Sequence, residues 1–401
     1  MSETNKSVYF NPWDPAFRTN PYPSYEPLLA GSPQFFELFG RVLLTARFDD
    51  VTTILKDYEH FRATRPPMPA SFRDQGPFKG ATVMLFADPP VHTRLRGLVS
   101  RDFTPRRIRE MEPRIRAIAD QLMEGVARKG ELDVMSDVAD VLPVMVIAEM
   151  LGVPPELYPQ FKQWSDTVVA GGNTFPGMPV PPDFKKATDE LRAYLAAQIE
   201  MRRSKPGSDL ISALVAAHAD GEALTEAELL AFVVLLLLAG NETTTNLIGN
   251  GMLALGRNPD QMDLVRRNPE LTPRAIEEIL RYDGPVQATV RFAAQGAEVG
   301  GVQVPPGTGC FAILAAANRD PSRWENPGRF DVTREPKDHV AFGDGIHFCI
   351  GAPLARLEGT IAIGSMLKRF PKLRLKDPGL EPKHKGSYFL RGLESLPMAF
   401  D

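Results

Sequence analysis

The chain has 401 residues, which is enough for two or three average domains or for one large domain. Hydrophobic residues make up 43% and charged residues 24% of the chain, a composition that excludes a mainly disordered or fibrous protein. A chain of this length can bury a large core without metal or disulfide staples. The formal net charge of −4, from 46 basic and 50 acidic residues, provides no positive excess for binding nucleic acid or an anionic membrane.

Cysteine content and apolar runs predict the compartment. Two cysteines are too few for a disulfide framework, so a reducing cytoplasm is expected. Residues 1–12 are polar and lack the basic start and apolar stretch of a signal peptide. The longest apolar run, Leu229 to Gly240, has 12 residues and is too short to span a bilayer. We therefore expect a soluble cytoplasmic protein without a membrane anchor.

The amino-terminal part, about residues 1–90, is rich in proline and aromatic residues and is predicted to be the β-richer part of the chain. Residues 41–45 predict a strand, and residues 49–58 predict a helix after it. Residues 64–90 have little periodicity and many Pro, Gly and Phe residues, so they predict a long loop. Loops of this length in compact proteins often serve as lids or binding loops.

Residues from about 92 to 285 have mostly helical periodicity, interrupted by a second apolar loop at 171–182. No internal repeat, low-complexity tract or linker divides the chain. Helical segments clearly exceed strands, which are short. The sequence therefore predicts a mainly α protein, one helical domain over residues 1–401 with small peripheral β-sheets.

A long central helix is predicted to begin at Thr225, which forms a capping box with Glu228, and to run to about Gly256. From Leu229 to Leu238 it is apolar around nearly its whole circumference, so it should cross the centre of the protein. Its middle, Ala239 to Thr245, contains a glycine, a glutamate and three threonines. These residues are unfavourable inside a buried helix, and such departures usually mark functional sites.

Two later elements are also predicted. A helix begins at Thr272, with proline in its first turn, and carries Glu278 and Arg281 on one face because they are three residues apart. Residues 298–314 alternate in polarity and contain Gly300-Gly301, a pattern typical of a hairpin.

The segment Phe342 to Gly351, FGDGIHFCIG, carries the strongest chemical signal. It ends where a final helix is predicted to start, so Cys349 lies at a helix amino terminus, where a thiolate is favoured. Glycines around it let the backbone approach a flat ligand. A single cysteine excludes structural zinc and iron–sulfur clusters but can hold haem iron. The alternative, an inert buried cysteine, would require this spacing to arise by chance; Cys310, without such context, is predicted to be inert.

This segment resembles the haem-ligand signature of cytochromes P450. The resemblance extends over essentially the whole chain and implies a P450-type helical domain of the soluble bacterial class, which takes electrons from separate proteins. The other matching segments, in order, are DPPVHTRLR at 88–96, AGNETT at 239–244, EILR at 278–281 and PGRF at 327–330.

The resemblance also implies site residues for haem b and its co-substrate dioxygen. Cys349 matches the axial thiolate, and Glu242 with Thr243 matches an acid–alcohol pair that delivers protons for dioxygen cleavage. Ala239 and Gly240 would leave room for oxygen. The implied partners of the haem propionates are His92, Arg96, Arg291 and His347, and the remaining cofactor-binding residues of the ligand loop are Phe342, Gly343, Gly345 and Gly351.

Two charged groups have implied roles away from the reaction. Glu278, Arg281 and Arg329 resemble a buried structural ion network, although an exposed helix pair is the ordinary alternative. A basic patch is expected to dock an acidic ferredoxin, and simple solvation would explain the same arginines equally well. The residues of this patch are Arg356, Arg106, Arg107 and Arg109. A monomer is expected.

The reaction predicted from the resemblance is a monooxygenation that uses dioxygen and two electrons. The alternatives are a peroxide-driven peroxygenase, which would not need the Glu242–Thr243 pair, and a haem sensor, which would not explain that pair.

The substrate is expected to be a neutral, small-to-medium hydrophobic compound, terpenoid or aromatic, because apolar residues dominate the candidate pocket. A carboxylated substrate is the alternative, through Arg65, Arg73 or Lys79. The pocket candidates are Phe86, Val169, Leu235, Leu238, Val286, Thr289 and Phe389, with Met68, Phe72, Phe78, Phe175, Met178 and Tyr388 from the same segments.

Overall fold

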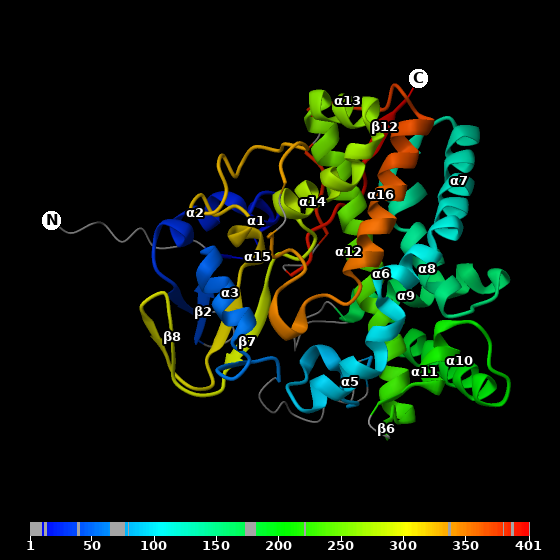
Figure 1. Cartoon of the computed structure of the whole chain (residues 1–401). Coiled ribbons are helices and arrows are strands. Elements are labelled where there is room, and N and C mark those ends of the chain that lie inside the picture. The colour runs from blue at the N-terminus through cyan, green and yellow to red at the C-terminus, as the bar shows by residue number, and fades with distance from the viewer. Residues whose placement is uncertain are drawn as a thin grey trace. The chain divides into compact units, whose positions relative to one another are not determined.

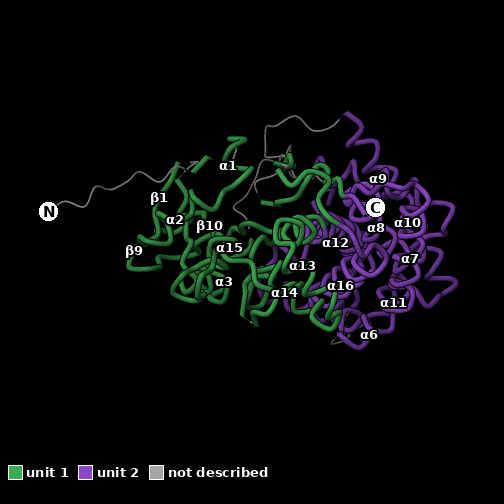
Figure 2. Tube along the Cα trace, turned by 90° about the horizontal axis from the view of Figure 1, so that it is seen from above, with its two compact units in different colours: residues 1–66, 249–349, 374–398 green, residues 67–248, 350–373, 399–401 purple. Residues whose placement is uncertain are grey.

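The computed structural model divides the chain into two compact units. Unit 1 comprises residues 1–66, 249–349 and 374–398, and unit 2 comprises residues 67–248, 350–373 and 399–401 (Figure 2). The residues that the structure describes are 10–11, 14–37, 41–64, 77–78, 80–172, 182–219, 222–335, 338–379, 381–385 and 389–400.

Unit 1 is built around a five-stranded sheet with the strand order β1-β2-β10-β7-β3. The strands β2 and β10 are parallel, and the other neighbours are antiparallel. The strands of this unit are β1 Gln34–Glu37, β2 Arg41–Thr45, β3 Phe61–Arg62, β7 Thr289–Ala293, β8 Ala297–Val299, β9 Val302–Val304, β10 Gly309–Ala312, β11 Arg374–Leu375 and β12 Pro397–Ala399.

Helices cover both faces of this sheet (Figure 1). Because side chains alternate along a strand, Leu43 and Cys310 pack with α3 residues on one face, while Leu44 and Phe311 pack with α2 and α15 residues on the other. The helices of unit 1 are α1 Pro15–Thr19, α2 Tyr22–Ala30, α3 Phe48–Lys56, α13 Pro259–Arg267, α14 Thr272–Asp283, α15 Leu314–Ala317 and the 3₁₀ turns η5 Pro269–Leu271 and η6 Gly345–His347.

Unit 2 is almost entirely helical. Its helix α16 packs against α7, α6 and α8, and α10 packs against α9 and α11. Its helices are α5 Val91–Val99, α6 Pro105–Glu110, α7 Glu112–Lys129, α8 Leu142–Met150, α9 Tyr158–Gly172, α10 Phe184–Ser204, α11 Leu210–Ala216 and α16 Ala352–Arg369. Its short elements are the 3₁₀ turns η1 Met84–Phe86, η2 Ser100–Phe103 and η4 Pro155–Leu157, the π-helical segment η3 Met135–Ala139, and the strands β4 Leu132–Asp133, β5 His218–Ala219 and β6 Glu222–Ala223.

The predicted long helix is α12, Glu226–Arg257, with 32 residues. The capping box is present: the backbone N–H of Thr225 donates to Glu228 at 2.9 Å, and the backbone N–H of Glu228 donates to Thr225 Oγ1 at 3.2 Å. By length and composition alone this helix could cross a membrane. The sequence analysis did not expect this, because the longest apolar run has only 12 residues. However, 61% of its most apolar window is buried inside the protein, as expected for a core helix.

The mainly α fold with small sheets is confirmed, and so are several individual elements. The strand predicted at 41–45 is β2, and the hairpin turns at Gly300 and Gly301, whose φ angles are +54° and +79°. This hairpin is shorter than the predicted 298–314: it ends at Val304, and Gly309–Ala312 forms β10, which pairs with β2 and β7 instead. The helix predicted at 49–58 ends earlier, at Lys56, because Asp57 caps the following turn by accepting from the His60 backbone N–H at 3.1 Å.

Glu358 on α16 is a buried acid that the sequence analysis did not single out. Its side chain is 2% exposed, and its Oε2 atom has no hydrogen-bond partner among the described residues. Burial raises the pKa of Glu358 from 4.5 to about 8. Between those values the folded protein retains a proton that the unfolded chain has released, so the free energy of unfolding falls as pH rises.

We therefore expect Glu358→Gln to become progressively more stable than the wild type between pH 5 and pH 8, by about 4 kcal/mol at the upper end. Urea unfolding at both pH values measures the difference. Glu124→Gln, at an exposed position of α7, is the matched control and should show no such trend. An equal difference in the free energy of unfolding between Glu358→Gln and the wild type at pH 5 and pH 8 would contradict the raised pKa of Glu358.

Candidate active site

The loop that carries Cys349 is fixed within unit 1 by close backbone contacts. The backbone N–H of Cys349 donates to the Phe342 carbonyl at 2.9 Å. Gly343 and Gly345 have φ angles of +71° and +66°, which favour glycine. A Cβ on Gly345 would lie 2.5 Å from the Leu55 carbonyl oxygen. At Gly345, therefore, the missing side chain permits a close approach to the end of α3.

The two cysteines differ sharply in environment. Cys349 is exposed and lies three residues before the first residue of α16, whose N-cap is Gly351. The neighbouring Phe348 is 39% exposed, which is unusual for a large apolar residue. Cys310 is buried in β10, and burial raises its pKa to about 12. Only Cys349 can therefore present a thiolate to an added ligand.

The donor set fits a haem. The described part of the chain holds no cluster of three His, Cys, Asp or Glu residues that could bind a metal ion. Cys349 would thus provide one ligand, and a haem macrocycle brings the equatorial ligands of its own iron.

Two predicted partners of the haem propionates lie in unit 1. Arg291 on β7 is buried, and its Nη1 donates to Thr289 Oγ1 at 3.2 Å and to the Val290 carbonyl at 2.9 Å. His347 ends η6, two residues before Cys349. The hydroxyl of Thr289, predicted as a pocket wall, is therefore engaged by Arg291.

The other two predicted partners lie on α5 in unit 2. His92 is buried, and Arg96 follows one helical turn later on the same face. The intervening Arg94 forms an ion pair with Glu228 at the start of α12. His92 and Arg96 therefore share the face of α5 that is predicted to bind propionates.

The polar middle of α12 coincides with a break in its burial. The stripe Leu236, Ala239, Gly240 and Thr243 is exposed or half-buried within a helix that is otherwise largely buried, and these residues share one helical face. Thr243 Oγ1 donates to the Ala239 carbonyl at 2.6 Å, the back-bond expected of a helical threonine. Glu242 next to it is buried.

Gly240 has a packing role that the sequence analysis did not predict. A Cβ at this position would lie 2.8 Å from Ile147 Cδ1 on α8, so the absent side chain allows two helices of unit 2 to pack closely. Room for oxygen on the exposed stripe would come from Ala239, whose small side chain is exposed.

Polar neighbours on α12 fix the position of the acid–alcohol pair. Asn241 donates to Ser165 Oγ at 2.7 Å, and Thr245 Oγ1 donates to the Ala139 carbonyl at 2.8 Å. Asn246 is completely buried, and neither atom of its amide has a hydrogen-bond partner among the described residues. The sequence analysis missed Asn246, although an amide one turn after Glu242 in an apolar helix is a detectable signal.

The pocket candidates of unit 2 are brought together in part. Phe86 packs on a cluster that contains Leu235 and Ala231 of α12. Leu238 and Val169 are half-buried on α12 and α9, and neither belongs to that cluster.

Two pocket candidates of unit 1, Val286 and Phe389, lie on neighbouring segments but pack on different core clusters. Val286 forms a β-bridge with Leu390, and the Phe389 ring stacks on Phe311 with centroids 5.8 Å apart. Further predicted residues lie outside the described residues: Arg65, Met68, Phe72, Arg73, Lys79, Phe175, Met178 and Tyr388.

The Glu278–Arg281 ion pair is confirmed as buried. Both side chains are 0% exposed, and two parallel hydrogen bonds of 2.7 Å join them. Arg281 also donates to the carbonyls of Asn318, Pro327 and Arg329 at 2.9–3.1 Å.

The prediction that the Arg329 side chain completes this network is wrong. Its side chain is 67% exposed and lies 3.8 Å from Asp331. Its backbone carbonyl faces Arg281, whereas Arg334 Nε lies 3.5 Å from Glu278 Oε1. In the turn at 326–329 the carbonyl and the side chain of Arg329 point in different directions, which the spacing of charges in the sequence does not reveal.

The predicted basic patch lies on neighbouring helices of unit 2, since α6 packs against α16. Arg106, Arg107 and Arg109 are exposed on α6, and the first two lie 3.6 and 3.3 Å from Glu110. Arg356 on α16 is half-buried.

Comparison with known proteins gives a consistent result. A family model described as Cytochrome P450 matches residues 173–392. The chain is 42% identical over 387 residues to Vitamin D(3) 25-hydroxylase of Pseudonocardia autotrophica, covering 95% of this chain and 94% of that protein. It is 46% identical over 316 residues to Cytochrome P450 107B1 of Saccharopolyspora erythraea, covering 79% and 76%.

A solved structure agrees in fold along the whole chain. Cytochrome P450 PksS from the bacillaene polyketide synthase of Bacillus subtilis 168 has a TM-score of 0.89 and 36% identity, covering 98% of this chain and 100% of that chain. The chain belongs to the cytochrome P450 family and is a haem-thiolate monooxygenase that binds haem b and uses dioxygen.

Proposed function

We propose that this enzyme inserts one oxygen atom of dioxygen into a C–H bond of a neutral hydrophobic substrate, with Cys349 as the iron ligand and Glu242 and Thr243 as the proton-delivering pair. The observation that carries the proposal is the exposed Cys349 thiol on its glycine-rich loop, since the other cysteine is buried and inert. Bound haem supplies iron that activates dioxygen.

The residues of the chain then hold the cofactor and move protons. His92, Arg96, Arg291 and His347 would neutralise the propionates of bound haem by charge-assisted hydrogen bonds. Glu242 supplies a proton, and Thr243 Oγ1 passes it towards the exposed stripe of α12. The back-bond from Thr243 to Ala239 fixes the position of that hydroxyl oxygen.

Thr243→Ala is expected to uncouple the reaction. NAD(P)H would still be consumed, but hydrogen peroxide would replace product, because the hydroxyl delivers protons and does not hold the haem. The measurements are product formed and hydrogen peroxide formed per NAD(P)H consumed. The ratio of product to peroxide should fall about 100-fold, the order of magnitude lost with a proton-transfer group. Thr243→Ser retains the hydroxyl and is the matched control; equal coupling in Thr243→Ala and the wild type would remove Thr243 from the mechanism.

The intact acid–alcohol pair supports the dioxygen reaction over a peroxide-driven one. A carbon monoxide difference spectrum of the reduced holoenzyme tests thiolate ligation. Turnover that requires NAD(P)H and redox proteins supports the monooxygenase; turnover with hydrogen peroxide alone, at the same rate, supports the peroxygenase. A holoenzyme with neither activity would favour a haem sensor.

The electron donor is proposed to be a separate ferredoxin-type protein in the cytoplasm, with the enzyme acting as a monomer. Support comes from the three exposed arginines of α6 and from Arg356 on the helix packed beside it. Complementary charges accelerate association and make it sensitive to salt. A rate of haem reduction that does not change with ionic strength would count against this surface.

The substrate is proposed to be neutral and apolar. The packing of Phe86 with Leu235 and of Phe389 with Phe311 supports this class, because apolar walls hold a ligand by burial. A relative that is 42% identical is named for hydroxylation of vitamin D3, a neutral apolar compound.

Spectral titrations distinguish neutral from carboxylate substrates. We expect type I shifts with vitamin D3, and tighter binding of methyl myristate than of myristic acid, a pair that differs only in charge at one end. A several-fold preference is expected because an unpaired carboxylate is costly to bury. Tighter binding of the acid, lost in Arg65→Ala, Arg73→Ala or Lys79→Ala, would establish the carboxylate alternative.

A further inference from the structure

Two segments that carry candidate pocket residues of unit 1 are hydrogen-bonded to each other. The backbone N–H of Arg391 donates to the Pro285 carbonyl at 2.7 Å, and that of Gln287 donates to the Phe389 carbonyl at 2.9 Å. Val286 and Leu390 are β-bridge partners between these bonds. The backbone positions of Val286 and Phe389 are therefore set together, although Val286 packs on the cluster of Leu43 and Phe389 on that of Leu44 and Phe311.

An ion pair lies behind this junction. Arg391 Nε donates to Asp283 Oδ1 at 2.8 Å, and both side chains are about nine-tenths buried. The remaining guanidinium nitrogens of Arg391 donate to the carbonyls of Arg18 and Thr19, the latter at 2.9 Å. The guanidinium group of Arg391 thus links the carboxyl-terminal segment to the end of α14 and the end of α1.

The Asp283 carboxylate is held by further partners. Tyr22 donates its hydroxyl proton to Asp283 Oδ1 at 2.6 Å, and the Arg319 guanidinium lies 3.4 Å from the Tyr22 ring centroid. Burial alone would raise the pKa of Asp283, but Arg391 and Arg319 hold it below its ordinary value. Asn250 donates to the carbonyls of both Asp283 and Arg391 at 3.0 Å.

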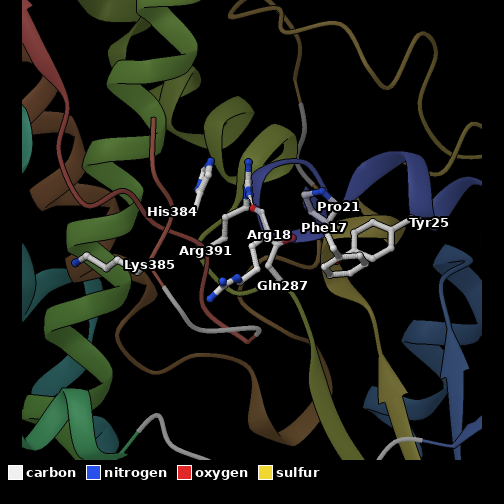
Figure 3. Close-up of a pocket in the computed structure, with 8 residues that line it drawn as sticks. All are labelled: Phe17, Arg18, Pro21, Tyr25, Gln287, His384, Lys385 and Arg391. Carbon is white, nitrogen blue, oxygen red and sulfur yellow. Dashed lines mark hydrogen bonds between the residues drawn. The ribbon is translucent and has the colours of Figure 1, made fainter. Parts of the chain in front are cut away.

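A small cavity adjoins the same group (Figure 3). It has a volume of about 20 Å³, enough for one water molecule, and Arg391, Gln287 and Tyr25 line it. Gln287 Oε1 and the Tyr25 hydroxyl have no hydrogen-bond partner among the described residues. The interior therefore has polar room beside Arg391 for a shorter cation at this position.

We propose that the Asp283–Arg391 ion pair, with Tyr22 as its third member, is a positioning clasp that sets the shape of the substrate pocket through Val286 and Phe389. This inference rests on the proposed function, because it takes those two residues as pocket walls. In this proposal the clasp has a positioning role only. It acts by fixing the backbone on which the walls are carried.

The test uses the holoenzyme and two iron-binding probes, imidazole and 4-phenylimidazole. Arg391→Lys retains the charge but cannot reach Asp283 and both carbonyls with one nitrogen. We expect haem loading and imidazole affinity to remain unchanged, because imidazole is too small to reach the walls. We expect 4-phenylimidazole affinity to fall about tenfold, since a displaced wall misplaces a larger ligand.

Tyr22→Phe is the second variant and keeps the ring on which Arg319 stacks, so it decides the outcome if Arg391→Lys does not fold. Val286→Ala changes the wall itself and is the reference. The clasp is overturned if Val286→Ala alters 4-phenylimidazole affinity while both clasp variants leave it unchanged. If Val286→Ala also leaves 4-phenylimidazole affinity unchanged, Val286 is not a pocket wall and the clasp proposal is wrong. The carbon monoxide spectrum tests thiolate ligation independently of that result.

Discussion

The Cys349→Ala variant is expected to lose the red-shifted carbon monoxide band of the reduced protein and all oxygenase activity. The reason is that Cys310 cannot replace the lost thiolate: it is buried within the sheet of unit 1, and burial raises its pKa to about 12. The measurement is the reduced carbon monoxide difference spectrum, with turnover in the presence of NAD(P)H and redox proteins.

Cys310→Ala is the matched control for this experiment. It removes a sulfur from the core but should retain the band and the activity, with a modest loss of stability. Retention of the red-shifted band in Cys349→Ala would show that the ligand assignment is wrong.

The Glu278→Ala variant is expected to yield little folded, haem-loaded protein. The substitution leaves Arg281 without its carboxylate partner at a site that is 0% exposed, and breaking such a pair costs about 3–5 kcal/mol. That loss is comparable to the net stability of many domains. Thermal unfolding and the ratio of haem to protein measure it.

Arg329→Ala provides a sharp comparison. Because this side chain is largely exposed and only its carbonyl contacts Arg281, the variant should lose less than about 1 kcal/mol. Equal losses in Glu278→Ala and Arg329→Ala would restore Arg329 as a member of the buried network. A stable, fully haem-loaded Glu278→Ala protein would show that the Glu278–Arg281 pair is not needed for stability.

Local features of the chain were predictable because their causes are close together in sequence. The capping box of Thr225 and Glu228 and the apolar run after it define the start and burial of α12 over a few helical turns. The Gly300-Gly301 turn follows from backbone conformations that glycine adopts readily.

The family was predictable for a similar reason. Five short motifs in a fixed order, including the segment that contains Cys349, are each readable within about ten residues. The comparisons bear out that resemblance along nearly the whole chain.

The site required the tertiary structure wherever its parts come from distant segments. Asp283 and Arg391 are 108 residues apart, and no periodicity relates them. Phe86 and Leu235 meet only because the segment before α5 packs on α12.

Side-chain direction was also decided by packing. Gly240 fits against Ile147 of α8, and Arg329 turns its carbonyl inward while Arg334 approaches Glu278. The sequence by itself determined several local elements and the family and predicted the thiolate ligand, since each depends on neighbours along the chain. Only the tertiary structure decided which charges and walls meet, because burial and hydrogen bonding between distant segments depend on how the whole chain packs.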